Sequence, residues 1–324
     1  MSEFAMIERF FRPLSRHTEV VQRGIGDDCA VLSVPAGEEL LISVDTLVEG
    51  VHFPANYPPA QLARRALAVC ASDLAASGAQ PRAFTLALCL PELNAPWLEQ
   101  FSAALAADAA AYDMVLVGGD TTRGPLCITL QVMGTAPRGT ALLRSGAQPG
   151  DRIFVSGTVG DARAALDFLS VVQASASQQY CLERYHSPQP RLALGMALRG
   201  IASAALDISD GLAADLGHIL TASGVGARLE VDRLPVSAAL RQLYPEGSAR
   251  VDGMPVAWRY ALSGGDDYEL CFTAAPEQRN SIEALAQSLS IAITEVGEIV
   301  ADSGLRCVDS NGAAVSPAAG YQHF

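Results

Sequence analysis

Aspartates recur in this sequence at one kind of position, after a short apolar run and among Gly, Ser or Thr residues. Loops at strand ends are where α/β proteins bind ligands, and clustered carboxylates suit Mg²⁺, which proteins often hold together with nucleotide phosphates. Asx turns and helix N-caps favour the same residues, so any one site alone has an ordinary structural explanation. Five sites in one chain favour metal binding: GIGDD (Asp27, Asp28), SVDT (Asp45), VGGDTT (Asp120), DISDG (Asp207, Asp210) and SGGDDYEL (Asp266, Asp267).

Two further segments place carboxylates where they need a partner. Asp73 lies inside ALAVCASDLAAS, which is otherwise nearly apolar, so an ionised carboxylate there needs a cation or several hydrogen bonds. The alternative is one exposed residue on an amphipathic helix. In DISDGLAADLGHIL we expect a strand, then Ser209 as the N-cap of a helix whose N-terminus is available for a phosphate. Asp207 and Asp210 could hold a metal on both sides of that turn, although a simple capped helix explains the same residues.

The composition excludes several classes of chemistry. All 22 basic residues are Arg, so there is no P-loop lysine, protein-kinase strand lysine or Schiff-base lysine. The formal charge of −13 disfavours binding to nucleic acid and to anionic lipid. The seven cysteines form no C-x-x-C pair and predict buried thiols in a reducing compartment. Without a signal peptide or a long apolar run, the expected location is the cytoplasm, with no membrane contact.

Short apolar runs alternate with helical stretches, which predicts an α/β (α+β) fold in two units joined near the Gly/Pro-rich segment 137–150. We expect domains at 1–147 and 148–324, a Gly-Gly turn after Val117, and variable loops at 171–180 and 243–256. Helices are expected at 58–77, 95–111, 160–170, 190–203, 210–222 and 276–289. Strands are expected at 29–34, 40–44, 83–90, 114–117, 126–136, 153–157, 204–208, 268–273, 291–298 and 304–308.

Seven segments in chain order resemble the thiamine-monophosphate kinase family, part of the ATP-binding superfamily that includes aminoimidazole ribonucleotide synthetase. The resemblance runs from about residue 3 to the terminal GYQHF, and it is the combination of segments that is specific. The segments are GIGDDCAVL, SVDTLVEGVHF, ALAVCASDLAASGAQP, GGDTTRGPL, LRSGAQPGD, DISDGLAADLGHI and SGGDDYEL.

The resemblance implies a two-domain fold of the aminoimidazole ribonucleotide synthetase type. Its N-terminal domain would bind ATP and Mg²⁺ and pair with its twin in a homodimer with a β-barrel-like core, and its C-terminal α/β domain would complete the active site. The implied reaction transfers the γ-phosphate of ATP to thiamine monophosphate, giving thiamine diphosphate, with several Mg²⁺ ions. Another superfamily member, a non-catalytic nucleotide- or Mg²⁺-binding dimer and a metal-dependent phosphatase are the competing interpretations.

The resemblance also implies site residues. The metal set would be Asp28, Ser43, Val44 through its backbone carbonyl, Asp45, Asp73, Asp120, Asp207 and Asp210. ATP contacts would come from Gly119, Asp120, Arg144, Ser209 and Tyr112. Substrate contacts would come from His52, which has loop packing as its alternative role, and from Asp266.

Two positions depart from the family pattern. Asp266 replaces the more usual Glu, which keeps the charge and shortens the reach. Ala318 stands where the family often has an aromatic residue that stacks on the substrate, and Tyr321 is the nearby substitute. We expect no protein nucleophile, because a phosphate monoester is largely ionised at neutral pH and its oxygen can attack the γ-phosphorus directly, in line.

Overall fold

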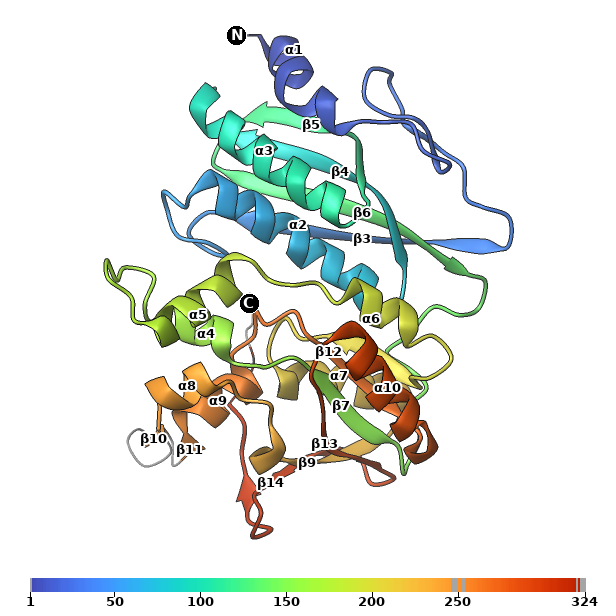
Figure 1. Ribbon diagram of the computed structural model, residues 1–324, viewed down its shortest axis with the longest axis vertical. Helices are drawn as coiled ribbons and strands as arrows, with labels where there is room; N and C mark the ends of the chain where they lie inside the picture. Colours follow the sequence, from blue (N-terminus) through green and yellow to red (C-terminus); the bar gives the residue numbers. More distant parts are fainter. Residues whose placement is uncertain (1, 246–249, 252–253, 319, 321–324) are drawn as a thin grey trace. The chain divides into compact units, whose positions relative to one another are not determined.

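The computed structural model describes residues 2–245, 250–251, 254–318 and 320, and the chain divides into two compact units (Figure 1). Unit 1 comprises Met1–Leu74 and Ala79–Ala141, and unit 2 comprises Ala75–Gly78 and Leu142–Phe324. No helix in the described part of the chain is long and apolar enough to span a membrane.

Unit 1 is built on a four-stranded sheet in the order β3-β6-β4-β5. The strands are β3 (Glu38–Val48), β4 (Gln80–Leu90), β5 (Val115–Arg123) and β6 (Cys127–Pro137). β4 and β5 are parallel, whereas β6 runs antiparallel to both of its neighbours. Helices α2 (Pro59–Ala76) and α3 (Ala95–Ala111) lie side by side over the sheet (Figure 1). Short elements precede it: α1 (Glu3–Met6), η1 (Ile7–Phe11), η2 (Arg12–Leu14), β1 (Val21–Arg23) and β2 (Val31–Leu32).

Side chains alternate along β3, as the two-residue period of a strand requires. Ser43 and Asp45 lie on one face and are partly buried, while Leu40, Ile42 and Val44 on the other face are exposed. This sheet therefore has a covered face that carries polar residues and an apolar face left open in the single chain.

Unit 2 contains a mixed seven-stranded sheet in the order β15-β14-β9-β13-β7-β12-β8. The strands are β7 (Arg152–Ser156), β8 (Ala204–Asp207), β9 (Gly226–Glu230), β12 (Leu270–Ala274), β13 (Ile293–Val300), β14 (Gly304–Val308) and β15 (Ala314–Val315). A separate small ladder joins β10 (Arg250–Val251) to β11 (Met254–Pro255). The helical elements are α4 (Asp161–Ala165), α5 (Ala176–His186), α6 (Leu192–Ala197), α7 (Leu212–Ser223), η3 (Val231–Arg233), α8 (Ala238–Leu243), α9 (Val256–Ser263), η4 (Pro276–Gln278) and α10 (Arg279–Leu289).

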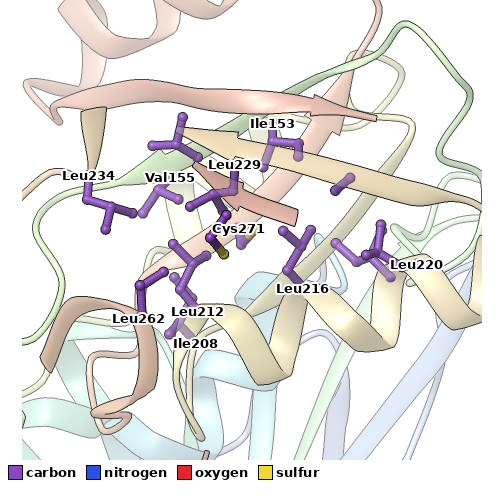
Figure 2. Packing of buried hydrophobic residues seen from close by; sticks show 14 of the residues in the cluster. Ile153, Val155, Ile208, Leu212, Leu216, Leu220, Leu229, Leu234, Leu262 and Cys271 are labelled. Carbon is purple, nitrogen blue, oxygen red and sulfur yellow. The ribbon is translucent and has the colours of Figure 1, made fainter. Parts of the chain in front are cut away.

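The main core of unit 2 lies between α7 and this sheet. Leu212, Leu216 and Ile219 recur at helical spacing along α7 and pack with strand residues such as Val155 and Leu229 (Figure 2). A second cluster contains the stacked rings of Phe154 and Phe272, whose centroids are 5.3 Å apart, with residues of α6 and α10. The first turn of α7 is thereby held firmly, which matters because the DISDG segment leads into it.

Several sequence expectations are confirmed, with α3 spanning the predicted 95–111, and others are wrong. The Gly-Gly turn after Val117 does not exist, because Gly118 and Gly119 lie inside β5. The expected loop 171–180 contains the start of α5, which Ser175 caps, and the expected loop 243–256 reaches the first residue of α9. The expected strand 29–34 is reduced to β2, and Cys29 is exposed rather than buried.

The barrel expected from the family is not present within one chain. Both large sheets have open strand orders, and no sheet formed by the described residues closes on itself. A single copy supplies four strands to unit 1, so closure into a barrel would need strands from outside this chain.

Candidate active site

Unit 1 brings three predicted metal ligands together between α2 and the sheet. Ser43 and Asp45 project from β3, and Asp73 comes from α2; the Ser43 hydroxyl donates a hydrogen bond to Oδ2 of Asp73. Burial raises the pKa of Asp45 to about 6, the Asp73 carboxylate adds to that rise, and a hydrogen bond from the Cys70 thiol partly offsets it. Two carboxylates that repel each other in a partly buried place form a site that a cation would stabilise.

A cavity of about 620 Å³ in unit 1 collects three more of the predicted residues. Its lining includes Asp28 from the GIGDD loop and Gly119 and Asp120 from β5, together with apolar side chains of the N-terminal helices. Gly119 has φ of 153°, and a Cβ there would lie 1.9 Å from the carbonyl oxygen of Leu86 on β4. This close approach of β5 to β4 is therefore open only to glycine, and the exposed Asp120 carboxylate follows directly after it.

The structure places the other unit 1 candidates elsewhere. His52 Nδ1 accepts a hydrogen bond of 3.0 Å from the Val48 amide, so the ring packs against the end of β3. Tyr112 is the C-cap of α3, and burial, with a contribution from the Asp108 carboxylate, raises its pKa. Neither side chain is among the described residues that line the cavity. Val44 exposes its side chain on the open face, so only its carbonyl is left for a ligand role.

Unit 2 joins the DISDG and SGGDDYEL segments through their backbones. The Asp266 amide donates to the Ser209 carbonyl at 2.8 Å, and the Tyr268 amide donates to the Ile208 carbonyl at 2.9 Å. Gly265 has φ of 69°, and a Cβ on it would lie 2.4 Å from the Ser209 carbonyl oxygen, so this close approach also requires glycine. Asp266 accepts a hydrogen bond of 3.0 Å from the Tyr268 hydroxyl. Asp207, Ser209, Asp210 and Asp266 are thus gathered by adjoining loops.

The expected capping of α7 by Ser209 is wrong. The helix begins at Leu212 with Gly211 as its N-cap, and Oδ2 of Asp215 accepts hydrogen bonds from the amides of Ser209, Asp210 and Gly211 at 3.0, 3.0 and 3.1 Å. These three amides are satisfied by the protein's own carboxylate, so they are not available for a phosphate as expected. Burial raises the pKa of Asp215 to about 6, against the lowering effect of these hydrogen bonds.

One predicted residue of unit 2, Arg144, does not join this group. Arg144 is exposed, and its carbonyl accepts a hydrogen bond of 3.3 Å from the hydroxyl of Ser223, the last residue of α7. The DISDG loop lies at the other end of this helix, whose 12 residues span about 18 Å. Tyr321 lies outside the described residues. Ala318 is described, and its carbonyl accepts a hydrogen bond of 2.9 Å from the Ser263 hydroxyl.

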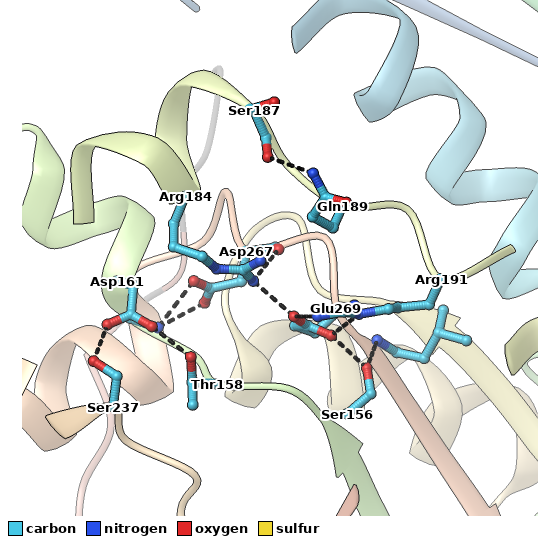
Figure 3. A network of polar contacts seen from close by, with 12 residues as sticks. Ser156, Thr158, Asp161, Arg184, Ser187, Gln189, Arg191, Ser237, Asp267 and Glu269 are labelled. Atoms are coloured by element: carbon cyan, nitrogen blue, oxygen red, sulfur yellow. Dashed lines mark hydrogen bonds and ion pairs between the residues drawn. The ribbon is translucent and has the colours of Figure 1, made fainter. Parts of the chain in front are cut away.

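Sequence reasoning missed a buried ionic network next to these loops (Figure 3). Glu269 is fully buried, and its carboxylate accepts hydrogen bonds from Arg184 at 2.7 Å, from Arg191 at 2.5 and 2.6 Å, and from the Ser156 hydroxyl at 2.6 Å. Asp267 accepts from the Gly160 amide through both oxygens, and burial raises its pKa well above the ordinary value. The signal that singled out Asp73, an acid inside an apolar run, was also present for Glu269 in YELCF.

No group of three acidic, imidazole or thiol side chains within the described ranges is placed to hold a metal ion. Mg²⁺ does not need such a cage, since proteins usually bind it through one or two carboxylates and the phosphates of the substrate. The Asp45 and Asp73 carboxylates with the Ser43 hydroxyl offer hard oxygen donors, and a divalent cation would relieve the repulsion that raises the pKa of Asp45. The residues present therefore fit Mg²⁺ bound together with a nucleotide.

The comparisons with known proteins identify the two domains. Residues 26–136 match the family model of the AIR synthase related protein N-terminal domain, and residues 148–310 match that of the C-terminal domain. The chain thus has the two-domain fold of AIR synthase related proteins.

Full-length relatives narrow the family. The chain is 48% identical over 326 residues to the thiamine-monophosphate kinase of Salmonella typhimurium, covering 99% of this chain and 98% of that protein. The crystal structure of thiamine-monophosphate kinase from Stenotrophomonas maltophilia K279a matches with a TM-score of 0.87 and 44% identity, covering 97% and 98%. A structure described as AaThiL complexed with AMPPCP and TMP matches with a TM-score of 0.79 and 31% identity, covering 99% and 97%. The chain belongs to the thiamine-monophosphate kinase family.

Proposed function

We propose that this protein transfers the γ-phosphate of ATP to thiamine monophosphate, forming thiamine diphosphate and ADP. The substrates are inferred from the full-length relatives, one of which is described as complexed with AMPPCP and TMP. The structural observation that carries the proposal is the partly buried Asp45–Asp73 pair, because the repulsion between the two carboxylates and the raised pKa of Asp45 are typical of a site that works with a bound cation.

The proposed ligands come from both units. In unit 1 they are Asp28, Ser43, the Val44 carbonyl, Asp45, Asp73 and Asp120, and in unit 2 they are Asp207 and Asp210. In this lysine-free chain only Arg, backbone amides and bound Mg²⁺ can neutralise phosphate charge, and several Mg²⁺ ions would supply most of that neutralisation. Gly119, Asp120, Arg144, Ser209 and Tyr112 are the proposed ATP contacts. His52, Asp266 and Tyr321 are the proposed contacts to thiamine monophosphate.

The proposed reaction needs no covalent intermediate with the protein. An oxygen of the thiamine monophosphate phosphate attacks the γ-phosphorus in line, the bond between the γ-phosphorus and the β–γ bridging oxygen breaks, and ADP leaves. No protein nucleophile takes part, because the attacking phosphate is already largely ionised near neutral pH. Gly119 lets β5 lie close against β4 directly before Asp120, and the linked loops of Ser209 and Asp266 would bring the proposed ATP contact beside the proposed substrate contact.

We also propose that the active form is a homodimer. Ile42 and Val44, 53% and 58% exposed, lie on the open apolar face of β3, and two such faces packed together would form the barrel-like core. The interface would bury more than about 2,000 Å², the range of obligate dimers. A stable, active monomer in sedimentation at micromolar concentration would contradict this.

An acceptor screen with ATP and Mg²⁺ tests the proposed function. The purified protein should form thiamine diphosphate from thiamine monophosphate, with one ADP released for each product molecule. Phosphate release without an acceptor would favour a phosphatase, and nucleotide binding without turnover would favour a non-catalytic protein. Activity only with a different acceptor would favour another enzyme of the same superfamily.

A further inference from the structure

Asp215 makes an unusual set of contacts at the start of α7. One oxygen of its carboxylate, Oδ2, accepts hydrogen bonds from the consecutive amides of Ser209, Asp210 and Gly211, all between 3.0 and 3.1 Å. The residue is 4% exposed and is held by a helix whose neighbouring side chains, Leu212 and Leu216, are fully buried in the core.

Consecutive amides that converge on one point form a concave site that binds anions. In this protein that site is filled from within, because the chain supplies its own carboxylate. The three amides belong to the residues between Asp207 and α7, so their direction fixes the backbone from which the Ser209 and Asp210 side chains project. A rigid backbone at this point orients two groups without any contact between Asp215 and a ligand.

The effect reaches the second loop of the site. The Ser209 carbonyl accepts the Asp266 amide at 2.8 Å, so the position of Asp266 depends on the same backbone. Gly265 and Gly211 bring the two loops close together, with a Cβ on Gly211 lying 2.8 Å from Cα of Ser263. Asp215 is therefore placed to hold one loop directly and the other through it.

We propose that Asp215 is a positioning residue for phosphoryl transfer, acting by filling the anion-binding site of the 209–211 amides and so fixing Ser209, Asp210 and Asp266. The proposal rests on the proposed function of those three residues. Residues that orient metal ligands typically change metal affinity or activity by 10–100-fold when they are replaced.

The test compares Asp215→Ala and Asp215→Asn with Asp309→Ala as the matched control. Oδ1 of Asp309 also accepts two backbone amides, from Asn311 and Ala313 at 2.9 and 2.8 Å, but in the turn between β14 and β15. Steady-state rates are measured over a range of Mg²⁺ and ATP concentrations, and unfolding of each variant is followed in parallel.

Asp215→Ala should lower kcat by about 10–100-fold and raise the Mg²⁺ concentration needed for half-maximal activity, as expected for a residue that orients ligands. Asp215→Asn keeps an acceptor oxygen and should lose clearly less. Formate, a small carboxylate, should restore part of the Asp215→Ala activity, whereas chloride should not. Asp309→Ala should keep the wild-type Mg²⁺ dependence, with or without formate.

The proposal is overturned if folded Asp215→Ala has wild-type kcat and Mg²⁺ dependence, or if folded Asp215→Asn is as impaired as Asp215→Ala. If Asp215→Ala does not fold, the proposal is judged on Asp215→Asn alone. A loss of kcat in that variant without any change in its Mg²⁺ dependence contradicts the proposal. Hydrogen exchange at the 209–211 amides gives a readout independent of activity. These amides should lose protection from exchange in Asp215→Ala whether or not the wild-type protein makes thiamine diphosphate. A wild-type protein that makes none would overturn only the proposed function.

Discussion

Asp45 in unit 1 and Glu269 in unit 2 are both acids in buried surroundings, but their neighbours differ. Glu269 is surrounded by donors, with two arginines and the Ser156 hydroxyl directed at its oxygens. Asp45 has a second carboxylate, Asp73, beside it, and in the part of the chain that the structure describes it makes no ion pair with a basic side chain.

From this difference we infer that Glu269 serves the fold, whereas Asp45 is proposed to bind a cation. A buried charge is costly unless it is paired and hydrogen-bonded, and Glu269 meets that requirement within the chain. Asp45 does not, and the raised pKa records the unfavourable charge. Asp215 is intermediate between these two cases, because backbone amides donate hydrogen bonds to its carboxylate and these bonds stabilise the conformation of the 209–211 loop.

The largest effect on stability should follow from removing the acid that is fully paired. Glu269→Ala leaves Arg184 and Arg191 largely buried without their partner, and we expect a loss of about 3–5 kcal/mol in the free energy of unfolding. Glu298→Ala is the control, because its ion pair with Arg152 at 2.8 Å is about one-third exposed and should contribute less than about 1 kcal/mol. Denaturant unfolding measures the free energy of unfolding of both variants. Equal losses would show that the buried pairing of Glu269 contributes no more to stability than a partly exposed ion pair.

The acid without a basic partner should show itself in the pH dependence of stability. The pKa of Asp45 is about 6 in the folded chain, whereas the ordinary value for an aspartate is 3.8. The folded state therefore holds the proton of this carboxyl group more tightly than the unfolded state does. Stability should therefore fall as pH rises from about 4 to about 6, by at most about 3 kcal/mol from this residue. Asp45→Asn should flatten the curve in metal-free buffer. Asp215 titrates in both the wild-type protein and Asp45→Asn, so the measured quantity is the difference between their curves of stability against pH. Identical curves would show that Asp45 does not carry an unfavourable charge in the fold, contrary to the comparison with Glu269.

A smaller effect is expected at an arginine that is not committed to an acid. Arg144 is exposed and has no ion pair among the described residues, unlike Arg184 and Arg191. If it contacts ATP, Arg144→Ala should raise the KM for ATP about tenfold, equivalent to about 1.4 kcal/mol, with little change in kcat. Steady-state kinetics at two Mg²⁺ concentrations check this. Restoration of the KM by extra Mg²⁺ would mean that Arg144 acts through the metal instead.

Local sequence signals predicted the elements that local interactions form. Helix α3 has a side-chain cap at Asn94 and an Ala-rich body, and its prediction is confirmed. The Gly118-Gly119 turn failed because pairing with β4, distant in sequence, extends β5 through the glycines. The Ser209 cap failed because Asp215, further along the chain, takes the loop amides for itself.

The site divides in the same way. Two different local patterns pointed to these acids, Asp45 by its place after an apolar run and Asp73 by its apolar surroundings, and only the fold puts the two carboxylates side by side. The partners of Glu269 lie 78 and 85 residues away, so no pattern in a short segment could reveal them. Arg144 was found by its match to a family segment, but that match does not tell where the residue lies in space. The structure places its backbone at the C-terminal end of α7, away from the DISDG loop.

The most direct test of the central claim is the Mg²⁺ dependence of thiamine diphosphate formation by wild-type protein, Asp45→Asn and Asp73→Asn. Both substitutions keep the shape of the side chain and remove one charge, so the fold should survive, with equal or greater stability in metal-free buffer. We expect kcat to fall by about 10²–10⁴, equivalent to about 3–5 kcal/mol, and to recover in part as Mg²⁺ is raised. Wild-type kcat at ordinary Mg²⁺ in either folded variant would show that the Asp45–Asp73 pair does not hold the cation.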